Sequence, residues 1–167
     1  CGSGHKMLGP TGIGVVWGRK ELWDSMDPVY GGGDMIEEVY YDKATWAPVP
    51  HKFEAGTPPF VEAIGLGVAA EYLMNISMSE VQQHSDSLRE YAKSKLENID
   101  GLNVIHSISK NAGCTFAMSV EGAHAADISL MLDTYGVAVR AGHHCVQPFH
   151  RKLELDATFR ATGYIYN

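Results

Sequence analysis

The sequence has no long apolar run and little positive charge. None of its apolar stretches approaches the roughly 18 residues that a membrane-spanning helix needs, and its first residues lack the charged and apolar regions of a secretion signal. Thirteen Lys and Arg residues stand against twenty Asp and Glu residues, which gives a formal charge of -7 at pH 7. Such a balance disfavours binding to nucleic acid or to an anionic membrane surface. We therefore expect a cytoplasmic protein that binds neither.

Cysteine is scarce as well, because only Cys1, Cys114 and Cys145 occur in 167 residues. An odd number of widely spaced cysteines does not make a disulfide framework. Cys114 lies in the apolar run AGCTFAMSV, where a thiol is expected to pack as a small hydrophobic group. Cys145 alone has neighbours that suggest chemistry, since histidine and arginine flank it.

Hydrophobic residues make up 45% of the chain, which suits one ordinary domain or two small ones. Residues 12–18 predict a short buried strand, and residues 19–26 predict a short helix. Residues 27–57 are rich in glycine and proline, so we expect an irregular connection there. A domain boundary is accordingly expected near residue 50.

The segment that follows has the periodicity of helices and short strands. Apolar residues at helical spacing predict a buried helix over 58–74, and an amphipathic pattern predicts a second helix over 79–98. Shorter elements are expected beyond them, namely strands over 102–106, 114–120, 137–140 and 158–167 and a helix over 125–136. The predicted fold of this segment is α+β, with helices on one face of a small sheet.

The stretch RAGHHCVQP, which begins at Arg140, gathers reactive side chains between glycine and proline. A zinc site is disfavoured, because adjacent side chains such as His144 and Cys145 diverge and only His150 could join them. A nucleophilic cysteine fits better, since Arg140, His143 or His144 would stabilise its thiolate. An ordinary loop with hydrogen-bonded histidines remains the alternative, and no metal is expected.

A second motif, SGHKMLGPTGIG, begins at Ser3. It is not a Walker loop, because Lys6 precedes the glycines, and it is not a dinucleotide fingerprint, because Trp17 occupies the last glycine position. A partly desolvated lysine amine can form a Schiff base with a carbonyl group, and Ser3 and His5 could donate to a phosphate. A solvent-exposed lysine without a role is the alternative.

Four stretches, SGHKMLGPTGIG, KFEAGTP, GVAVRAGHHC and FRAT with the final YN, occur in the order and spacing of the pyridoxal-phosphate-dependent cysteine desulfurases. Over essentially its whole length the chain resembles the SUF-type branch, which includes selenocysteine lyases and has the class-V aminotransferase fold. The resemblance implies a small C-terminal α+β domain over 51–167 of a fold-type I enzyme. Residues 1–50 would be a remnant of its large α/β cofactor-binding domain.

The same resemblance implies roles for individual residues at the cofactor. Lys6 would carry pyridoxal 5'-phosphate and act as a base, and Ser3 and His5 would contact the cofactor phosphate. Thr57 would reach the phosphate of the other subunit in a homodimer.

The remaining roles concern the substrate, L-cysteine. Cys145 would accept its sulfur as a persulfide, His144 would carry protons, Arg160 would clamp the carboxylate and Arg140 would lie beside the loop. L-Alanine would be the product, and the sulfur would pass to an acceptor protein in iron–sulfur cluster assembly.

Family members are longer than this chain, so we interpret it as a C-terminal fragment of an enzyme that lacks part of its cofactor site. We expect the isolated fragment to be inactive for that reason. The alternative is a non-catalytic α+β fragment that acts as a dimerisation or interaction module.

Overall fold

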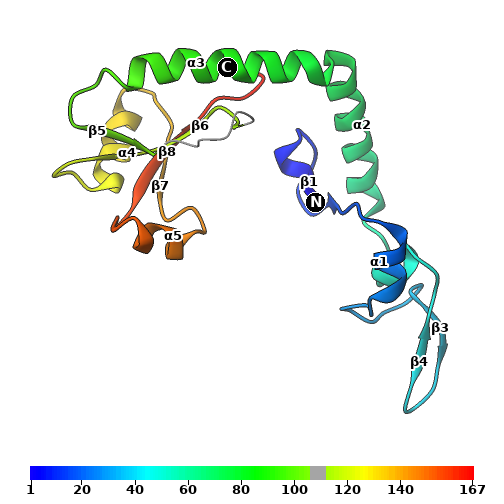
Figure 1. Cartoon of the computed structure of the whole chain (residues 1–167). Coiled ribbons are helices and arrows are strands. Elements are labelled where there is room, and N and C mark those ends of the chain that lie inside the picture. The colour runs from blue at the N-terminus through cyan, green and yellow to red at the C-terminus, as the bar shows by residue number, and fades with distance from the viewer. Residues whose placement is uncertain (106–111) are drawn as a thin grey trace. The chain divides into compact units, whose positions relative to one another are not determined.

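The computed structural model describes residues 1–105 and 112–167, and these fall into two compact units, Cys1–Ile76 and Ser77–Asn167 (Figure 1). The division follows the first long helix, α2 (Phe60–Ile76), instead of preceding it. The reason is that α2 packs on the N-terminal motif: a Cβ added at Gly65 would lie 3.1 Å from Pro10. The assignment of 1–50 and 51–167 to two family domains stays a prediction.

The first unit is built from short elements and α2. They are the strand pair β1 (Gly2–Ser3) and β2 (Gly14–Val15), the helix α1 (Lys20–Ser25), the hairpin β3 (Ile36–Val39) and β4 (Ala44–Trp46), and the 3-10 turns Gly4–Lys6 and His51–Phe53. The helix expected over 19–26 is confirmed by α1. The buried strand expected over 12–18 is wrong, because only two residues form strand and both are exposed.

The β3–β4 hairpin lies in the segment for which we expected no regular structure. Tyr40 N donates to Lys43 O at 2.8 Å across the turn, and Glu38 N donates to the Thr45 hydroxyl oxygen at 3.0 Å. Both strands are short and all but Ala44 of their residues are exposed, so neither has the apolar alternation that marks a half-buried strand. The glycines and prolines on either side therefore dominated the sequence pattern.

The helix α2 confirms the expected helix but not its complete burial. Leu66, Ala69 and Leu73, at spacings of three and four residues, form its buried stripe. Ile76 is half-buried, and the remaining large apolar side chains of α2 are exposed, namely Phe60, Val61, Ile64, Val68, Tyr72 and Met74. Among the described residues no single helix is long and apolar enough to cross a membrane, and α2 meets that test only as a broken pair with the helix that follows.

The second unit confirms the α+β prediction. Its described part holds an antiparallel four-stranded sheet in the order β5-β6-β8-β7, formed by Leu102–Ile105, Thr115–Val120, Thr158–Thr162 and Arg140–Gly142. The helices are α3 (Met78–Leu96), α4 (Ala125–Thr134) and α5 (Gln147–Lys152). Residue 106 of the strand expected over 102–106 lies outside the described residues.

Two predicted strands differ in their bounds, and one helix was not predicted. The strand expected over 137–140 begins only at Arg140, because the backbone amide of Val137 still caps α4 by donating to Leu132 O at 3.0 Å. The strand expected over 158–167 ends at Thr162. The polar stretch before it contains α5, which has Pro148 in its first turn, a position where proline is tolerated.

The sheet has two faces with different roles. Phe116, Met118 and Phe159 form the buried core with Cys114, and apolar residues of α3 and α4 pack against it, among them Leu88, Leu96, Ile128 and Leu132. Successive residues of a strand point to opposite faces. Thr158 and Arg160 therefore lie on the face opposite Phe159, and the candidate site is built there.

Candidate active site

The lysine motif is held by a tight loop of backbone hydrogen bonds. Gly4 N donates to Ile13 O at 2.9 Å, and Gly9 N donates to Gly4 O at 2.9 Å. A Cβ on Gly4 would lie 2.9 Å from Pro10 O, so this position has no room for a side chain. The glycines thus let the loop fold back on itself, and Lys6 is placed at the end of the 3-10 turn Gly4–Lys6.

The loop brings the three cofactor-binding candidates of the motif together. His5 and Lys6 are exposed on the 3-10 turn, and Ser3 is half-buried just before it. Within this chain Lys6 is therefore solvent-exposed, and its role at the cofactor stays a prediction. Thr57 is exposed in the same unit, and its role stays a prediction. An amine with hydroxyl and imidazole donors beside it suits a ligand with a carbonyl and a phosphate group.

Cys145 lies at the tip of a tight turn that follows β7. Val146 N donates to His143 O at 2.9 Å, and the two central residues, His144 and Cys145, have φ values of 51° and 64°. Non-glycine residues adopt positive φ rarely, and such strain costs about 1–3 kcal/mol per residue. The turn leaves Cys145 exposed while the ring of His144 lies half-buried against β8.

His144 is anchored on Thr158, which is completely buried. Its Nε2 lies 3.0 Å from the Thr158 hydroxyl oxygen and 3.1 Å from the Thr158 carbonyl oxygen. Burial lowers the pKa of His144 from its ordinary value of 6.5, and the positive charge of Arg160 lowers it further. His144 is therefore a neutral imidazole near pH 7.

Arg140 and Arg160 are direct partners in the antiparallel pair of β7 and β8, so both side chains lie on the site face of the sheet. The partner of Arg160 on its other side is Ala117, which is small. Neither arginine makes an ion pair with a carboxylate in the described part of the chain, and Arg160 Nε is buried without a hydrogen-bond partner there. Two guanidinium groups that lie on one face and have no carboxylate partner in the described residues suit an anionic ligand.

The structure groups the predicted site residues into two sets. Arg140, His144, Cys145 and Arg160 belong to the second unit, where β7, its following turn and β8 carry them. The other set, Ser3, His5, Lys6 and Thr57, belongs to the first unit.

Thr158 was not among the residues predicted for the site, and His150 was predicted only as a possible metal ligand. A signal for Thr158 was present, because it precedes Arg160 by two residues in an expected strand and so shares its face. His150 gave no such signal, since the helix that carries it was not predicted. Among the described residues no group of three His, Cys, Asp or Glu side chains is arranged to hold a metal ion.

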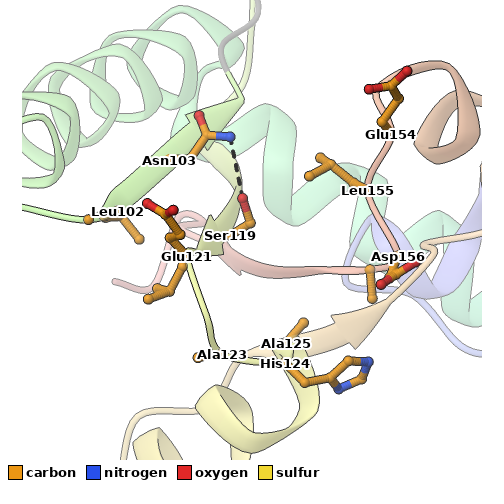
Figure 2. Close-up of a pocket in the computed structure, with 13 residues that line it drawn as sticks. Leu102, Asn103, Ser119, Glu121, Ala123, His124, Ala125, Glu154, Leu155 and Asp156 are labelled. Atoms are coloured by element: carbon orange, nitrogen blue, oxygen red, sulfur yellow. Dashed lines mark hydrogen bonds between the residues drawn. The ribbon is translucent and has the colours of Figure 1, made fainter.

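An open hollow of about 760 Å³ elsewhere in the second unit contains none of the predicted site residues. Asn103, Ser119, Glu121, Glu154 and Asp156 help to line it, and Asn103 Nδ2 donates to Ser119 Oγ at 3.3 Å (Figure 2). In Figure 2 the three carboxylates lie apart from one another and do not converge on one point. The residues that line this hollow include no cysteine, lysine or arginine, so the chemistry expected of the Cys145 turn is not found there.

The sequence of this chain is similar to those of known cysteine desulfurases. The model of the family described as Aminotransferase class-V matches residues 1–167. A probable cysteine desulfurase of Halobacterium salinarum is 47% identical over 165 residues, which are 99% of this chain and 40% of that protein. The cysteine desulfurase of Haloferax volcanii is 44% identical over 99% of this chain and 39% of its own length.

A solved structure leads to the same family. The cysteine desulfurase CsdA of Escherichia coli, in an S-sulfonic acid form, has a TM-score of 0.89 and 38% identity over 99% of this chain and 41% of its own. The chain belongs to the class-V aminotransferase family, and its resemblance to the pyridoxal-phosphate-dependent cysteine desulfurases is confirmed. It spans about 40% of the length of the curated relatives that it matches.

Proposed function

We propose that this chain is part of a cysteine desulfurase that converts L-cysteine to L-alanine and retains the sulfur on Cys145 as a persulfide. One observation carries the proposal: an exposed cysteine at the tip of a strained turn directly follows a strand whose Arg140 is paired with Arg160. A thiol nucleophile and a carboxylate-binding pair are thus carried by one sheet edge and its turn. The relatives named cysteine desulfurase support the same activity.

The residues of the first unit fit the cofactor of this family. Lys6 would hold pyridoxal 5'-phosphate through its amine, Ser3 and His5 would bind its phosphate, and Thr57 would contact the phosphate bound by the second subunit of a homodimer. When bound, the cofactor would withdraw electrons from Cα of the substrate and weaken the C–S bond.

The side chains of this chain then have separate tasks. Arg160 and Arg140 bind the substrate carboxylate, for which a guanidinium fork is well suited. The Lys6 amine takes the Cα proton as a general base. The Cys145 thiolate attacks the substrate sulfur, and the electron pair of the broken C–S bond stays on the carbon that becomes the alanine methyl group.

The exposed position of Cys145 also suits the next transfer. A persulfide at the tip of a turn can be reached by the thiol of a second protein, so a sulfur-acceptor protein in iron–sulfur cluster assembly is the proposed recipient. With its negative formal charge, the protein is proposed to act in the cytoplasm without binding nucleic acid or a membrane.

A chimera tests the activity, because the chain matches 41% of CsdA with a TM-score of 0.89. This chain replaces the matching part of CsdA, and alanine release from L-cysteine is measured. We expect turnover that Cys145→Ala abolishes and that Cys1→Ser, a change at another exposed cysteine, leaves intact. Turnover that survives Cys145→Ala, or a folded chimera that binds the cofactor and is inactive, would refute the proposed function.

A second function, that of a non-catalytic interaction module, is favoured for the isolated chain by one observation. Large apolar side chains of the first unit are exposed, with Trp17 at 86%, Val29 at 82% and Tyr30 at 78%. Apolar surface of this kind is normally covered by another chain or domain. Sedimentation of the isolated chain tests this, because an interaction module should self-associate or bind the rest of a relative such as CsdA, whereas a monomer that binds neither would exclude it.

A further inference from the structure

We propose that Thr158 and His150 are positioning residues that fix the tautomer of His144, so that Nδ1 of His144 keeps a free lone pair and is the nitrogen that accepts a proton during the reaction. The tautomer follows from this chain alone, whereas its use in catalysis rests on the proposed function.

The groups that surround the His144 ring place its hydrogen on one nitrogen, Nε2. The Thr158 carbonyl oxygen can only accept hydrogen bonds, and it lies 3.1 Å from His144 Nε2. The hydrogen must therefore be on Nε2, from which it is shared with the Thr158 hydroxyl oxygen at 3.0 Å. A neutral imidazole carries one hydrogen, so Nδ1 is left with a lone pair.

The Thr158 hydroxyl does not reverse this arrangement, because its own hydrogen is directed to His150. His150 Nδ1 lies 3.3 Å from the Val146 carbonyl oxygen, which can only accept, so Nδ1 of His150 carries its hydrogen. His150 Nε2 is then an acceptor, 3.0 Å from the Thr158 hydroxyl oxygen. The hydroxyl hydrogen points to His150, and the hydroxyl oxygen is free to accept from His144.

The hydrogen bonds therefore run in one direction, from His144 through Thr158 to His150 and on to Val146. Thr158 and His150 are almost fully buried, at 0% and 5% exposure, so water does not compete for these contacts. At the start of this series of hydrogen bonds, His144 Nδ1 is buried and has no hydrogen-bond partner among the described residues. A buried lone pair without a partner is costly unless a donor arrives during the reaction.

A donor that reaches His144 Nδ1 when the substrate is bound would meet this lone pair. Transfer of its proton to Nδ1 leaves hydrogen on both nitrogens of His144, and the bond from Nε2 to Thr158 is kept.

The surrounding charges make this transfer dependent on substrate. Arg160 and Arg140 from the sheet and His150 from α5 oppose a positive charge on His144, and the ring of His143 lies 5.5 Å from that of His150. A substrate carboxylate held by the arginines would offset their charge, and a nearby negative charge favours the protonated imidazole. His144 is thus a weak base in the free protein and a stronger one when the substrate is bound.

The tautomer is tested by nitrogen-15 NMR of the histidine side chains in the 167-residue chain, which requires no activity. We expect His144 to show hydrogen on Nε2 and a bare Nδ1, and His150 to show the opposite. Thr158→Val should populate both tautomers of His144, while Thr158→Ser, which keeps the hydroxyl, should restore one. Hydrogen on Nδ1 of His144 in the unsubstituted chain would overturn the proposal without bearing on the proposed desulfurase activity.

The catalytic consequence is tested in the CsdA chimera. Thr158→Val and His150→Phe should each lower kcat roughly tenfold, a modest part of what a positioned base contributes, and should shift the pH profile of kcat. KM should change little, and Thr158→Ser should restore the profile. If rate and pH profile are unchanged in both variants, the positioning role is wrong even where the chimera is active and depends on Cys145.

Discussion

Arg140 and Arg160 face each other as direct partners across β7 and β8. Neither arginine forms an ion pair with a carboxylate among the described residues. Like charges opposite each other destabilise an antiparallel pair. A site that binds an anion gains from the same arrangement, because the ligand removes the repulsion when it binds. The pair is thus best understood as a binding feature and not as a contribution to the stability of the sheet.

A stability prediction follows from this pair. Arg140→Ala should raise the free energy of unfolding of the ligand-free chain by a few tenths of a kcal/mol, because it removes the repulsion across the strands. Urea unfolding measures the change, with Arg151→Ala as the control for losing an exposed arginine on α5. A clear loss of stability on Arg140→Ala alone would mean that the arginine pair supports the fold.

Substrate binding should depend on the shape of the guanidinium group. In the CsdA chimera, Arg160→Lys keeps the charge but loses the two-pronged fork, so KM for L-cysteine should rise roughly tenfold or more. Arg151→Lys should leave KM unchanged. An unaltered KM in Arg160→Lys would place the carboxylate of the substrate elsewhere.

The lowered pKa of His144 predicts how stability changes with pH. In the folded chain His144 binds a proton less readily than in the unfolded chain, where its pKa is near the ordinary 6.5. As the pH falls below about 6.5, the unfolded state therefore takes up more protons and stability is lost. His144→Gln should weaken this acid-side loss in urea unfolding, whereas an equally steep loss in the variant would assign it to other groups.

The glycines of the lysine motif give a paired prediction. In Gly4→Ala the added Cβ would lie 2.9 Å from Pro10 O, so the substitution should destabilise the first unit. In the chimera the same substitution should prevent borohydride from fixing pyridoxal phosphate onto Lys6. Gly67→Ala, in α2 with open space around it, should instead stabilise the chain by roughly 0.5–1 kcal/mol. Thermal unfolding and mass mapping of the fixed cofactor decide both, and normal fixation in Gly4→Ala would show that the loop tolerates a side chain.

Sequence patterns predicted the elements whose apolar residues repeat over many positions. Burial of Leu66, Ala69 and Leu73 on one stripe is the pattern that marked α2 as a helix. The β3–β4 hairpin and α5 could not be predicted in the same way, because they are short and make few apolar contacts. Their stability comes from turn and cap hydrogen bonds that leave little trace in hydrophobic spacing.

The candidate site shows the same limit. Cys145, Arg160 and Lys6 were predicted because reactive side chains stand beside glycines in motifs with a family resemblance. The contact of His144 with Thr158 joins residues 14 positions apart. It depends on a turn with two positive φ values, which no single residue of the loop encodes. Only the folded sheet brings this pair together.

The reactivity of the cysteines gives a further test. Cys145 is exposed and should react with iodoacetamide in the folded chain, whereas Cys114 has 6% exposure in the core and should be protected until the chain unfolds. Cys1→Ser removes the other exposed thiol and simplifies the peptide map. Labelling of Cys114 ahead of Cys145 would contradict the placement of both residues.

The central claim is that sulfur from L-cysteine is transferred to Cys145, and mass spectrometry of the trapped persulfide tests it most directly. The CsdA chimera is treated with L-cysteine, its thiols and persulfides are alkylated, and its peptides are mapped. We predict one additional sulfur atom on the peptide that contains Cys145, and none there in Cys145→Ala. Sulfur found on Cys1 or Cys114, or alanine formed with no sulfur on Cys145, would contradict the account.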